Sequence, residues 1–403
     1  MCVLSERLRS NRSLCEQAGV AIIYYVAFGG FKKGKIVKIQ TVEAIPIELP
    51  VTRPLKMAVA TVSVRTCIVV RITTDDGLTG LGESVLARYF SGESLASAHD
   101  LITNVYTEVL IGRDPGEVNT IRTLMRRISV HNSGARAAVE MALLDIIAQA
   151  AGIPLYRFYG GRARESVPTI WHVSGGTPQE MAAEAANAAG EGYPLVKIKV
   201  GSDVDQDVAS TYAVRDAVGD EVMILPDANQ GWDVGDALRY MRGVEDARPG
   251  FVEQPVDRSD IIGMATLVSQ SPVLVAGDEG IFDAKELLTY LSMKAAGAVV
   301  AKLMKAAGPL GVRDVFAVAD AAGIGVHFAG MAGQSSISAA HGAHLALAMP
   351  NLRFGSGISP QYLADDVCEE RFLPIDGHLF PSDAPGVGVT IDEDKLHHYR
   401  VDT

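Results

Sequence analysis

The chain has 403 residues, of which 48% are hydrophobic and 21% are charged, and its formal net charge is −12. It is too long for one small hydrophobic core, so we expect two domains. The negative charge argues against a nucleic-acid partner, whose phosphates require a basic surface, so any anionic ligand must be held by local positive groups.

The cysteines and the apolar runs bear on the compartment. Four cysteines stand at positions 2, 15, 67 and 368 without CxxC spacing, which indicates neither a disulfide framework nor a zinc site and fits a reducing cytoplasm. No apolar run reaches the roughly 20 residues of a membrane span. The run VAIIYYVAF follows three arginines, but Glu16 and Gln17 precede it closely. We therefore expect residues 1–34 to be a loosely packed extension, or to result from a start site assigned too early, in preference to a targeting signal.

Residues 35–160 have the pattern of an α+β domain. KIVKIQTVEAIPIEL and RTCIVVRITTDDGLTGLGES read as strands, and Thr-Asp-Asp-Gly in the second predicts a hairpin turn. Helical periodicity follows over about 97–128. An alanine-rich helix is then predicted over 133–152, where Gly152 and Pro154 stop it. Strands followed by helices are typical of an α+β unit.

A regular alternation of short strands and helices begins after Gly161. Polar residues end successive strands at steps of 28, 26, 25, 24 and 25 residues. VPTIWHVSG precedes the series and LRFGSG follows it, which makes eight βα units. Such even spacing predicts a (β/α)₈ barrel over residues 161–365, with 366–403 as a C-terminal segment, in preference to a doubly wound sheet. The strand-ending residues are Lys199, Asp227, Glu253, Asp278, Lys302 and His327.

Two of these residues are lysines on strands that lie across the barrel from each other. Lys199 ends the second strand and Lys302 ends the sixth, so we expect their amines to face each other over the mouth. Lys197 shares a strand face with Lys199, because residues two apart point the same way.

Three carboxylates, Asp227, Glu253 and Asp278, lie on the arc between the two lysines. Like charges so close would raise one another's pKa or require a cation. An all-oxygen site with three protein ligands suits Mg²⁺, which keeps positions for water and substrate. The alternative is that the acids form salt bridges with the lysines.

A dication between two opposed amines suggests removal of the proton α to a carboxylate. The resulting enolate carries a second negative charge, and a unit-charge contact near 4 Å is worth about 4 kcal/mol at an effective dielectric of about 20. The base must be a neutral amine. Lys197 and the ion beside Lys199 would disfavour its ammonium form, and Lys197 could also touch the substrate carboxylate.

At these residues the chain resembles the enolase superfamily, in particular the muconate lactonizing enzyme subgroup. The matching motifs are VKIKVG, PDANQGW, VEQP, GDE and AKLMKAAG, together with MALLDIIAQAAGIPLYRFYGG and PGVGVTIDEDKL. Enolase-superfamily sites use a Lys or His base with one or two Mg²⁺ ions. The resemblance implies an α+β cap over the barrel mouth to which the C-terminal segment returns, with cap loops at Val51–Val64 and Leu86–Ser94.

Carried over by motif, the resemblance implies that Lys199 and Lys302 are the acid/base pair. Gln334 stands in a segment where many relatives carry an acid, and it supplies neither charge nor a proton. His327 invites comparison with the mandelate racemase branch, but Lys302 already fills the sixth-strand position, which favours a supporting or substrate-contacting role. The implied metal ligands are Asp227, Glu253 and Asp278.

These observations favour an Mg²⁺-dependent racemase or epimerase acting on the α-carbon of an amino-acid-derived carboxylate. A cycloisomerase or a hydroxy-acid dehydratase would pass through the same intermediate, and a non-catalytic metabolite-binding relative is a third reading. We expect a small-molecule carboxylate substrate and no nucleic-acid or membrane partner. The resemblance also implies a homo-oligomer.

Overall fold

The structure is a computed structural model, and it describes residues 37–56, 61–173 and 175–403. The predicted extension over residues 1–34, with Cys2 and Cys15, lies outside these ranges. Within them Cys67 and Cys368 are buried free thiols. No helix in the described ranges combines the length and apolarity needed to cross a bilayer.

The N-terminal part begins with a three-stranded antiparallel sheet in the order β1-β2-β3. Its strands are β1 (Ile39–Lys56), β2 (Thr61–Thr74) and β3 (Thr79–Val85). The predicted Thr-Asp-Asp-Gly hairpin joins β2 to β3, with Gly77 in the left-handed region at φ 93°. Both faces of β2 carry apolar residues into a core, with Ile68, Val70 and Ile72 on one face and Cys67 and Val69 on the other.

Helices then cover one face of this sheet and complete the cap. The helical run predicted over 97–128 is interrupted at 111–117, where Gly112 and Pro115 turn the chain. The helices are α2 (Arg88–Ser91), α3 (Leu95–Asp100), the π-helix η1 (Leu101–Tyr106), α4 (Thr107–Leu110), α5 (Val118–Ile128), α6 (Ser133–Ala150) and α7 (Leu155–Phe158).

Helix α6 lies unusually close to strand β3 because two glycines leave room for it. A Cβ on Gly82 would lie 1.9 Å from the Ala138 carbonyl oxygen, and one on Gly80 would lie 2.1 Å from that of Ala142. Nearly all of α6 is buried, and its small residues allow this approach. The cap is therefore packed around a helix–strand contact that tolerates no side chain at these positions.

The second part is an eight-stranded parallel sheet in the order β5 to β12. An isolated bridge between Thr169 and Ser356 joins its two ends and closes the barrel. The strands are β5 (Ile170–Val173), β6 (Leu195–Lys199), β7 (Met223–Asp227), β8 (Val252–Glu253), β9 (Val275–Gly277), β10 (Ala298–Lys302), β11 (Gly325–Ala329) and β12 (Ser356–Gly357).

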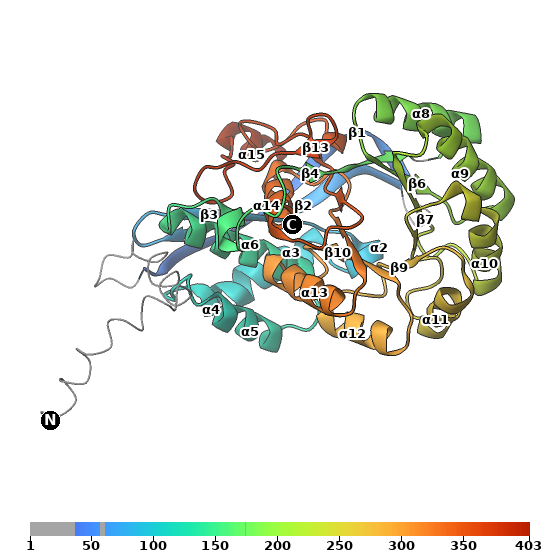
Figure 1. The fold of residues 1–403 in the computed structure, drawn as a ribbon. Helices are drawn as coiled ribbons and strands as arrows, with labels where there is room; N and C mark the ends of the chain where they lie inside the picture. The colour runs from blue at the N-terminus through green and yellow to red at the C-terminus, as the bar shows by residue number, and fades with distance from the viewer. Residues whose placement is uncertain (1–36, 57–60, 174) are drawn as a thin grey trace, which may run out of the picture.

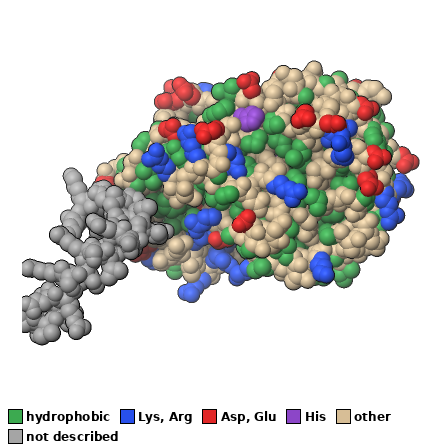
Figure 2. All heavy atoms as spheres, in the orientation of Figure 1, with side chains coloured by type: hydrophobic (Ala, Val, Ile, Leu, Met, Phe, Trp, Pro, Cys, Tyr) green, Lys and Arg blue, Asp and Glu red, His purple; other side chains and the backbone are tan. Residues whose placement is uncertain are grey.

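Seven helices alternate with these strands and surround them (Figure 1). Several begin at aspartate N-caps, such as Asp203 and Asp233, whose side chains accept backbone N–H groups of the first turn. On the face drawn in Figure 2, acidic and basic side chains are interspersed with apolar ones. The helices are α8 (Pro178–Gly190), α9 (Val204–Val218), α10 (Val234–Gly243), α11 (Ile261–Gln270), α12 (Ala284–Ser292), α13 (Pro309–Ala321) and α14 (Ser336–Ala348).

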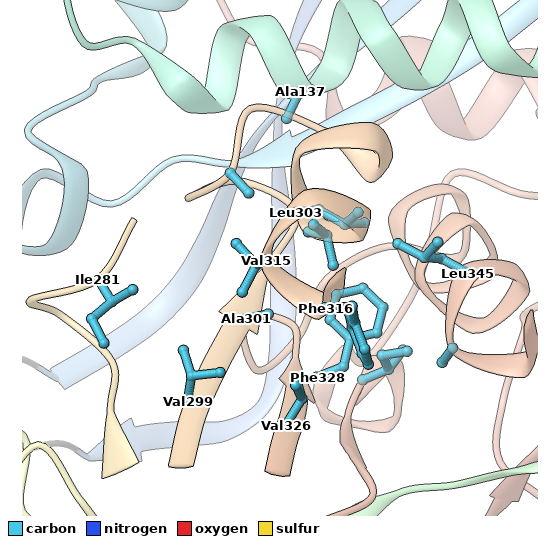
Figure 3. Packing of buried hydrophobic residues seen from close by; sticks show 14 of the residues in the cluster. Ala137, Ile281, Val299, Ala301, Leu303, Val315, Phe316, Val326, Phe328 and Leu345 are labelled. Carbon is cyan, nitrogen blue, oxygen red and sulfur yellow. The ribbon is translucent and has the colours of Figure 1, made fainter. Parts of the chain in front are cut away.

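Strand alternation decides which side chains enter the barrel. Ala298 and Val300 of β10 belong to the core inside the barrel, whereas Val299 and Ala301 pack outward. Figure 3 shows Val299 and Ala301 beside Val326 and Phe328 of β11, on the side of these strands that faces helix α13. Lys302 shares the inward face with Ala298 and Val300, because side chains repeat every second residue.

The C-terminal segment returns to the cap. Arg400 bridges Ile47 of β1, and the backbone N–H of Val401 donates to the Pro46 carbonyl at 3.0 Å. The segment contains β13 (His378–Leu379), paired with β4 (Val167–Pro168), and α15 (Glu393–Tyr399). The short helices η2 (Glu245–Ala247) and η3 (Pro360–Tyr362) complete the chain.

The predicted fold class is confirmed: a (β/α)₈ barrel with an N-terminal α+β cap that the C-terminal segment completes. The boundaries predicted at 35–160, 161–365 and 366–403 stay a prediction. Asp278 was predicted to end the fifth strand but lies one residue beyond β9, while β11 continues two residues past His327.

The close contact between β3 and α6 predicts that even a methyl group added at Gly82 would destabilise the protein. We expect Gly82→Ala to lower the free energy of unfolding by about 1–3 kcal/mol, because the added methyl group overpacks the cap. Urea denaturation followed by circular dichroism measures this. Gly190→Ala, at the exposed end of α8 with open space around its Cβ, is the matched control and should cost nothing. Equal losses for both variants would contradict the packing argument.

A buried histidine predicts acid sensitivity of the contact between α14 and the cap. His341 Nε2 lies 2.8 Å from the Leu81 carbonyl oxygen of β3, and burial lowers the pKa of His341 from 6.5 to about 3. The unfolded chain therefore binds the proton first. The stabilisation is complete above pH 6.5 and is lost as the pH falls toward 3.

We expect His341→Gln to reduce the slope of unfolding free energy against pH by about 1.4 kcal/mol per pH unit between pH 6 and 4. Urea titrations at several pH values measure that slope. His327 and His344 stay in place in the variant, so only the contribution of His341 is removed. An unchanged slope would show that His341 does not supply this acid sensitivity.

Candidate active site

One pocket lies at the carboxyl ends of the barrel strands and is lined by residues of both parts of the chain. The cap contributes Arg65, Tyr89 and Phe90, and the barrel contributes Lys199 and Lys302 among others. The two lysines come from β6 and β10, which are four strands apart in a ring of eight. They thus approach the pocket from opposite sides, as predicted from the strand count.

The lysine pair of β6 holds two of the predicted metal ligands. Lys197 Nζ lies 2.7 Å from Glu253 Oε1 and 2.9 Å from Asp227 Oδ2, and Lys199 Nζ lies 2.6 Å from the same Asp227 oxygen. Lys197 is buried and Lys199 is partly exposed to the pocket. Alternation along β6 places both amines inside the barrel, while Val196 and Ile198 pack outward.

The third predicted ligand, Asp278, is held by two other lysines. Lys302 donates to Asp278 Oδ2, and Lys305 Nζ lies 2.6 Å from Asp278 Oδ1. Lys305 also donates to the Asp278 and Val300 carbonyl oxygens at 2.7 and 2.6 Å, so its three protons are all used. Gln254 fixes the loop, because its Oε1 accepts the Asp278 N–H at 2.9 Å.

Two polar residues that sequence reasoning did not single out complete the ring. Asn229 Oδ1 accepts from Lys199 Nζ at 2.6 Å, and Asn229 Nδ2 donates to Glu279 Oε1 at 3.0 Å. Asn229 is in the left-handed region at φ 43°, which turns its side chain back over the mouth. Both residues stand inside quoted motifs, PDANQGW and GDE, but they follow the strand ends, where alternation no longer predicts direction.

The ring contains four ammonium groups and four carboxylates. Burial favours the neutral amine of Lys197, but Asp227 and Glu253 outweigh it and hold the pKa of Lys197 above its usual value. Burial likewise acts against ionised Asp227, yet Lys197 and Lys199 hold the pKa of Asp227 below its usual value. The ion pairs join Lys197, Lys199, Lys302 and Lys305 to Asp227, Glu253 and Asp278, while Glu279 accepts a hydrogen bond from the Asn229 amide.

Glu253 and Glu279 are the acids for which this pairing is incomplete. Burial, reinforced by Asp227, raises the pKa of Glu253 to about 8. Burial, reinforced by Asp278, raises the pKa of Glu279 to about 7. Glu253 Oε2 and Glu279 Oε2 are buried without a hydrogen-bond partner. Two unpartnered buried carboxylate oxygens at one mouth provide the donor atoms that a hard divalent cation prefers.

In the described residues the carboxylates are arranged around ammonium groups, and no cluster of three or more His, Cys, Asp or Glu side chains forms a ready metal site. The structure therefore shows salt bridges between the lysines and the acids, which the sequence left open as the alternative to a metal site. The residue types still fit Mg²⁺, because every acid is buried at one mouth and two of their oxygens are unpartnered.

Two histidines also reach the pocket. His327 Nδ1 lies 2.9 Å from the Phe354 carbonyl oxygen, and its Nε2 is buried without a partner. Burial lowers the pKa of His327 to about 3, with Lys197 adding to the effect, so the ring is neutral. His172 lines the pocket from β5, and burial lowers its pKa as well.

Gln334, Trp171 and Trp232 lie outside this pocket. Gln334 is buried and borders a small separate cavity that Lys302 also borders. Trp171 is outside the pocket lining, because it points away from its neighbour His172 on β5 and donates to Glu184 at 2.9 Å. Trp232, just before α10, packs on Tyr240 with ring centroids 4.5 Å apart.

The two implied cap loops meet the barrel differently. Residues 57–60 of the first loop lie outside the described residues, and its flanks are parts of β1 and β2. The second loop contains α2, from which Tyr89 and Phe90 reach the pocket. Lys302 Nζ lies 4.3 Å from the centre of the Phe90 ring, a cation–π contact between cap and barrel.

Comparison with known protein families places these features in context. Residues 40–160 match the family model described as the N-terminal domain of mandelate racemase / muconate lactonizing enzyme, and residues 180–395 match the model "Enolase C-terminal domain-like". A curated relative, the L-Ala-D/L-Glu epimerase of Bacillus subtilis, is 33% identical over 87% of this chain and 96% of its own.

Two solved structures are similar along almost their whole length. Muconate lactonizing enzyme from Pseudomonas fluorescens, complexed with muconolactone, has a TM-score of 0.87 at 31% identity, covering 91% of this chain and 100% of its own. Dipeptide epimerase from Enterococcus faecalis, complexed with Mg and the dipeptide L-Leu-L-Tyr, has a TM-score of 0.84 at 29% identity, covering 88% of this chain and 99% of its own.

Proposed function

This chain belongs to the mandelate racemase / muconate lactonizing enzyme family, and from that premise we propose that it is an Mg²⁺-dependent isomerase. Its motifs predicted this family, and that prediction is confirmed. The proposed reaction is removal of the proton α to a carboxylate, followed by its return in racemisation or epimerisation of an amino-acid-derived acid. Relatives named as epimerases support this choice.

The observation that carries the proposal is the placement of two lysines across one pocket. Lys199 on β6 and Lys302 on β10 line the same cavity from strands on opposite sides of the barrel. An α-carbon held between them would present one face to each amine. One amine could take the proton from one face while the other returns a proton to the opposite face, which inverts the centre.

Asp227, Glu253 and Asp278 are the proposed Mg²⁺ ligands, and the ion would require the ammonium groups that occupy their oxygens to move aside. When bound, the ion would supply positive charge against the charge that builds on the carboxylate oxygens of the substrate. Lys197, behind Lys199 and buried, would stay protonated and orient that carboxylate.

The charge balance of the ring also supports this assignment. When Glu253 and Glu279, whose pKa values burial raises, are ionised along with Asp227 and Asp278, the four ammonium groups and four carboxylates cancel. A bound dication would leave two positive charges in excess. One substrate carboxylate and the loss of one lysine proton would together restore neutrality, and these are the two changes that α-proton abstraction requires.

Cycloisomerisation is the second candidate, and the similarity to muconate lactonizing enzyme favours it. A dehydratase acting on a hydroxy acid would also pass through the same enolate. In both cases one lysine moves the proton and the other supplies positive charge. Product NMR separates the three, because racemisation conserves connectivity, cycloisomerisation changes it at constant mass, and dehydration lowers the mass by that of water. A non-catalytic binding role is disfavoured by the complete set of lysines and acids.

The substrate is proposed to be a small-molecule carboxylate. The pocket is closed on one side by Tyr89 and Phe90 of the cap, which would exclude water from the reacting carbon. A homo-oligomer and a cytoplasmic location remain part of the proposal. Gln334 and Lys197 are proposed to contact or tune the substrate site rather than to carry the proton.

The paired-lysine mechanism predicts a face-specific loss of exchange. In D₂O, we expect Lys199→Ala to abolish α-proton exchange from one enantiomer and Lys302→Ala to abolish it from the other, each by a factor of about 10²–10⁴. Proton NMR with N-acylated amino acids, dipeptides and proline-type acids measures this. Lys285→Ala, an exposed lysine on α12, is the control. Exchange that persists in the Lys199→Ala, Lys302→Ala double variant would refute the mechanism.

Metal removal provides a second test. We expect EDTA to abolish exchange and added Mg²⁺ to restore it. Thermal denaturation gives a readout independent of turnover: Mg²⁺ at about 100 times its dissociation constant should stabilise the wild type by about 2.7 kcal/mol. Glu253→Gln removes a ligand charge and should lose most of this shift, whereas Glu286→Gln on the exposed side of α12 should keep it. If neither EDTA nor added Mg²⁺ changes the exchange rate or the stability, the proposed metal dependence is excluded.

A further inference from the structure

Arg65 is a buried cation in the cap wall of the pocket. It lies on β2, its residue is 3% exposed, and it lines the same cavity as Lys199 and Lys302. Arg65 and Cys67 share one face of β2, directed toward the barrel loop after β11. The cap thus presents a guanidinium to a pocket whose opposite wall carries the reactive lysines.

The guanidinium of Arg65 has few partners. Nη2 donates to the Ala332 carbonyl oxygen, while Nε is buried without a hydrogen-bond acceptor. In the part of the chain that the structure describes, no carboxylate lies within ion-pair distance of Arg65. By contrast, Arg71 of the same strand pairs with Glu393 at 2.5 Å, and Arg53 of β1 pairs with Glu184.

Two buried carboxylates that influence this part of β2 are engaged elsewhere. Glu83 and Asp366 both act electrostatically on Cys67, as Arg65 does. Glu83, however, accepts the Ser335 hydroxyl and the Ser338 N–H, and Asp366 accepts the Ser336 N–H at 2.8 Å. Neutral donors occupy these acids, so Arg65 keeps an unpaired charge.

An unpaired buried charge is costly unless a ligand supplies its partner. We propose, resting on the function proposed above, that the substrate carries a second carboxylate and that Arg65 binds it. The first carboxylate lies with the lysines at the barrel end of the pocket, and the second lies at the cap end. Suitable substrates are amino acids with an acidic side chain, or amino acids whose N-acyl group ends in a carboxylate.

A planar carboxylate suits this position better than a monovalent halide or a neutral group. A guanidinium is a planar fork of N–H donors that matches two carboxylate oxygens, and in Arg65 only Nη2 donates to an acceptor among the described residues. The charge count agrees. With all four of its acids ionised, the ring at the barrel mouth is balanced without Arg65, so the second anionic group offsets the charge of Arg65.

The hydrogen bond from Arg65 to Ala332 would also allow a second role, in which Arg65 is only a clamp that holds the cap to the barrel. The two roles can be distinguished. A clamp affects every substrate equally, whereas a carboxylate receptor affects only those with the second charge. The test therefore uses matched pairs that differ in that charge alone: N-succinyl against N-succinamyl amino acids, and dipeptides containing Glu against the same dipeptides containing Gln.

We expect the wild type to prefer the charged member of a pair in kcat/KM. Arg65→Gln should lower kcat/KM for the charged member about 100-fold, mostly through KM, and change the uncharged member less than about threefold. Arg65→Lys should recover part of the loss. Arg71→Gln, on the same strand but paired with Glu43 and Glu393, is the control and should not change the ratio. Equal losses for both members would overturn the inference.

Calorimetric binding separates this inference from the proposed function. Succinate, glutarate and butanoate, each measured at one fixed Mg²⁺ concentration, report anion binding without turnover. Tighter binding of the dicarboxylates that is lost in Arg65→Gln supports the inference even if no acid shows α-exchange, in which case only the proposed reaction fails. Exchange without any dependence of binding or selectivity on Arg65 leaves the reaction intact and refutes the second carboxylate.

Discussion

The buried ring of charges at the barrel mouth is the constraint on which the rest of the structure depends. Four lysines and four acids lie in a region with little water, where an unpaired charge is costly. Eight strands hold them in register, and the residues after the strands, such as Asn229, lock their orientation. A small displacement of one strand would therefore unpair several groups at once.

The cap completes this arrangement as well as covering it. Helix α6 packs against β3 at glycine positions, the C-terminal segment adds to β1, and Phe90 lies against the Lys302 ammonium. The reactive pocket thus has a wall from each part of the chain. The barrel wall carries the lysines that we propose to move protons, and the cap wall carries aromatic rings and Arg65, which we propose to select the substrate. In this proposal, reaction and selection are separated between the two parts.

Much of this could be predicted because the inward face of each strand repeats every second residue. The even spacing of strand ends identified the barrel, and the two-residue period placed Lys197, Lys199 and Lys302 inside it. The helical run over 97–128 was less well predicted, because helical periodicity did not reveal the turn at Gly112. Glu279 and Asn229 were missed because they follow the strands, where the period ends.

The sequence by itself determined the barrel, the family and six of the eight charged groups at its mouth, all except Lys305 and Glu279, since these follow from local periodicity and motif. Only the tertiary structure decided which charge pairs with which, that Gln334 borders a separate cavity, and that Arg65 enters the pocket unpaired. Arg65 and Lys302 are far apart in sequence, on separate sheets. They line one pocket because of how the cap docks on the barrel. The residue pattern of a single strand carries no information about that docking.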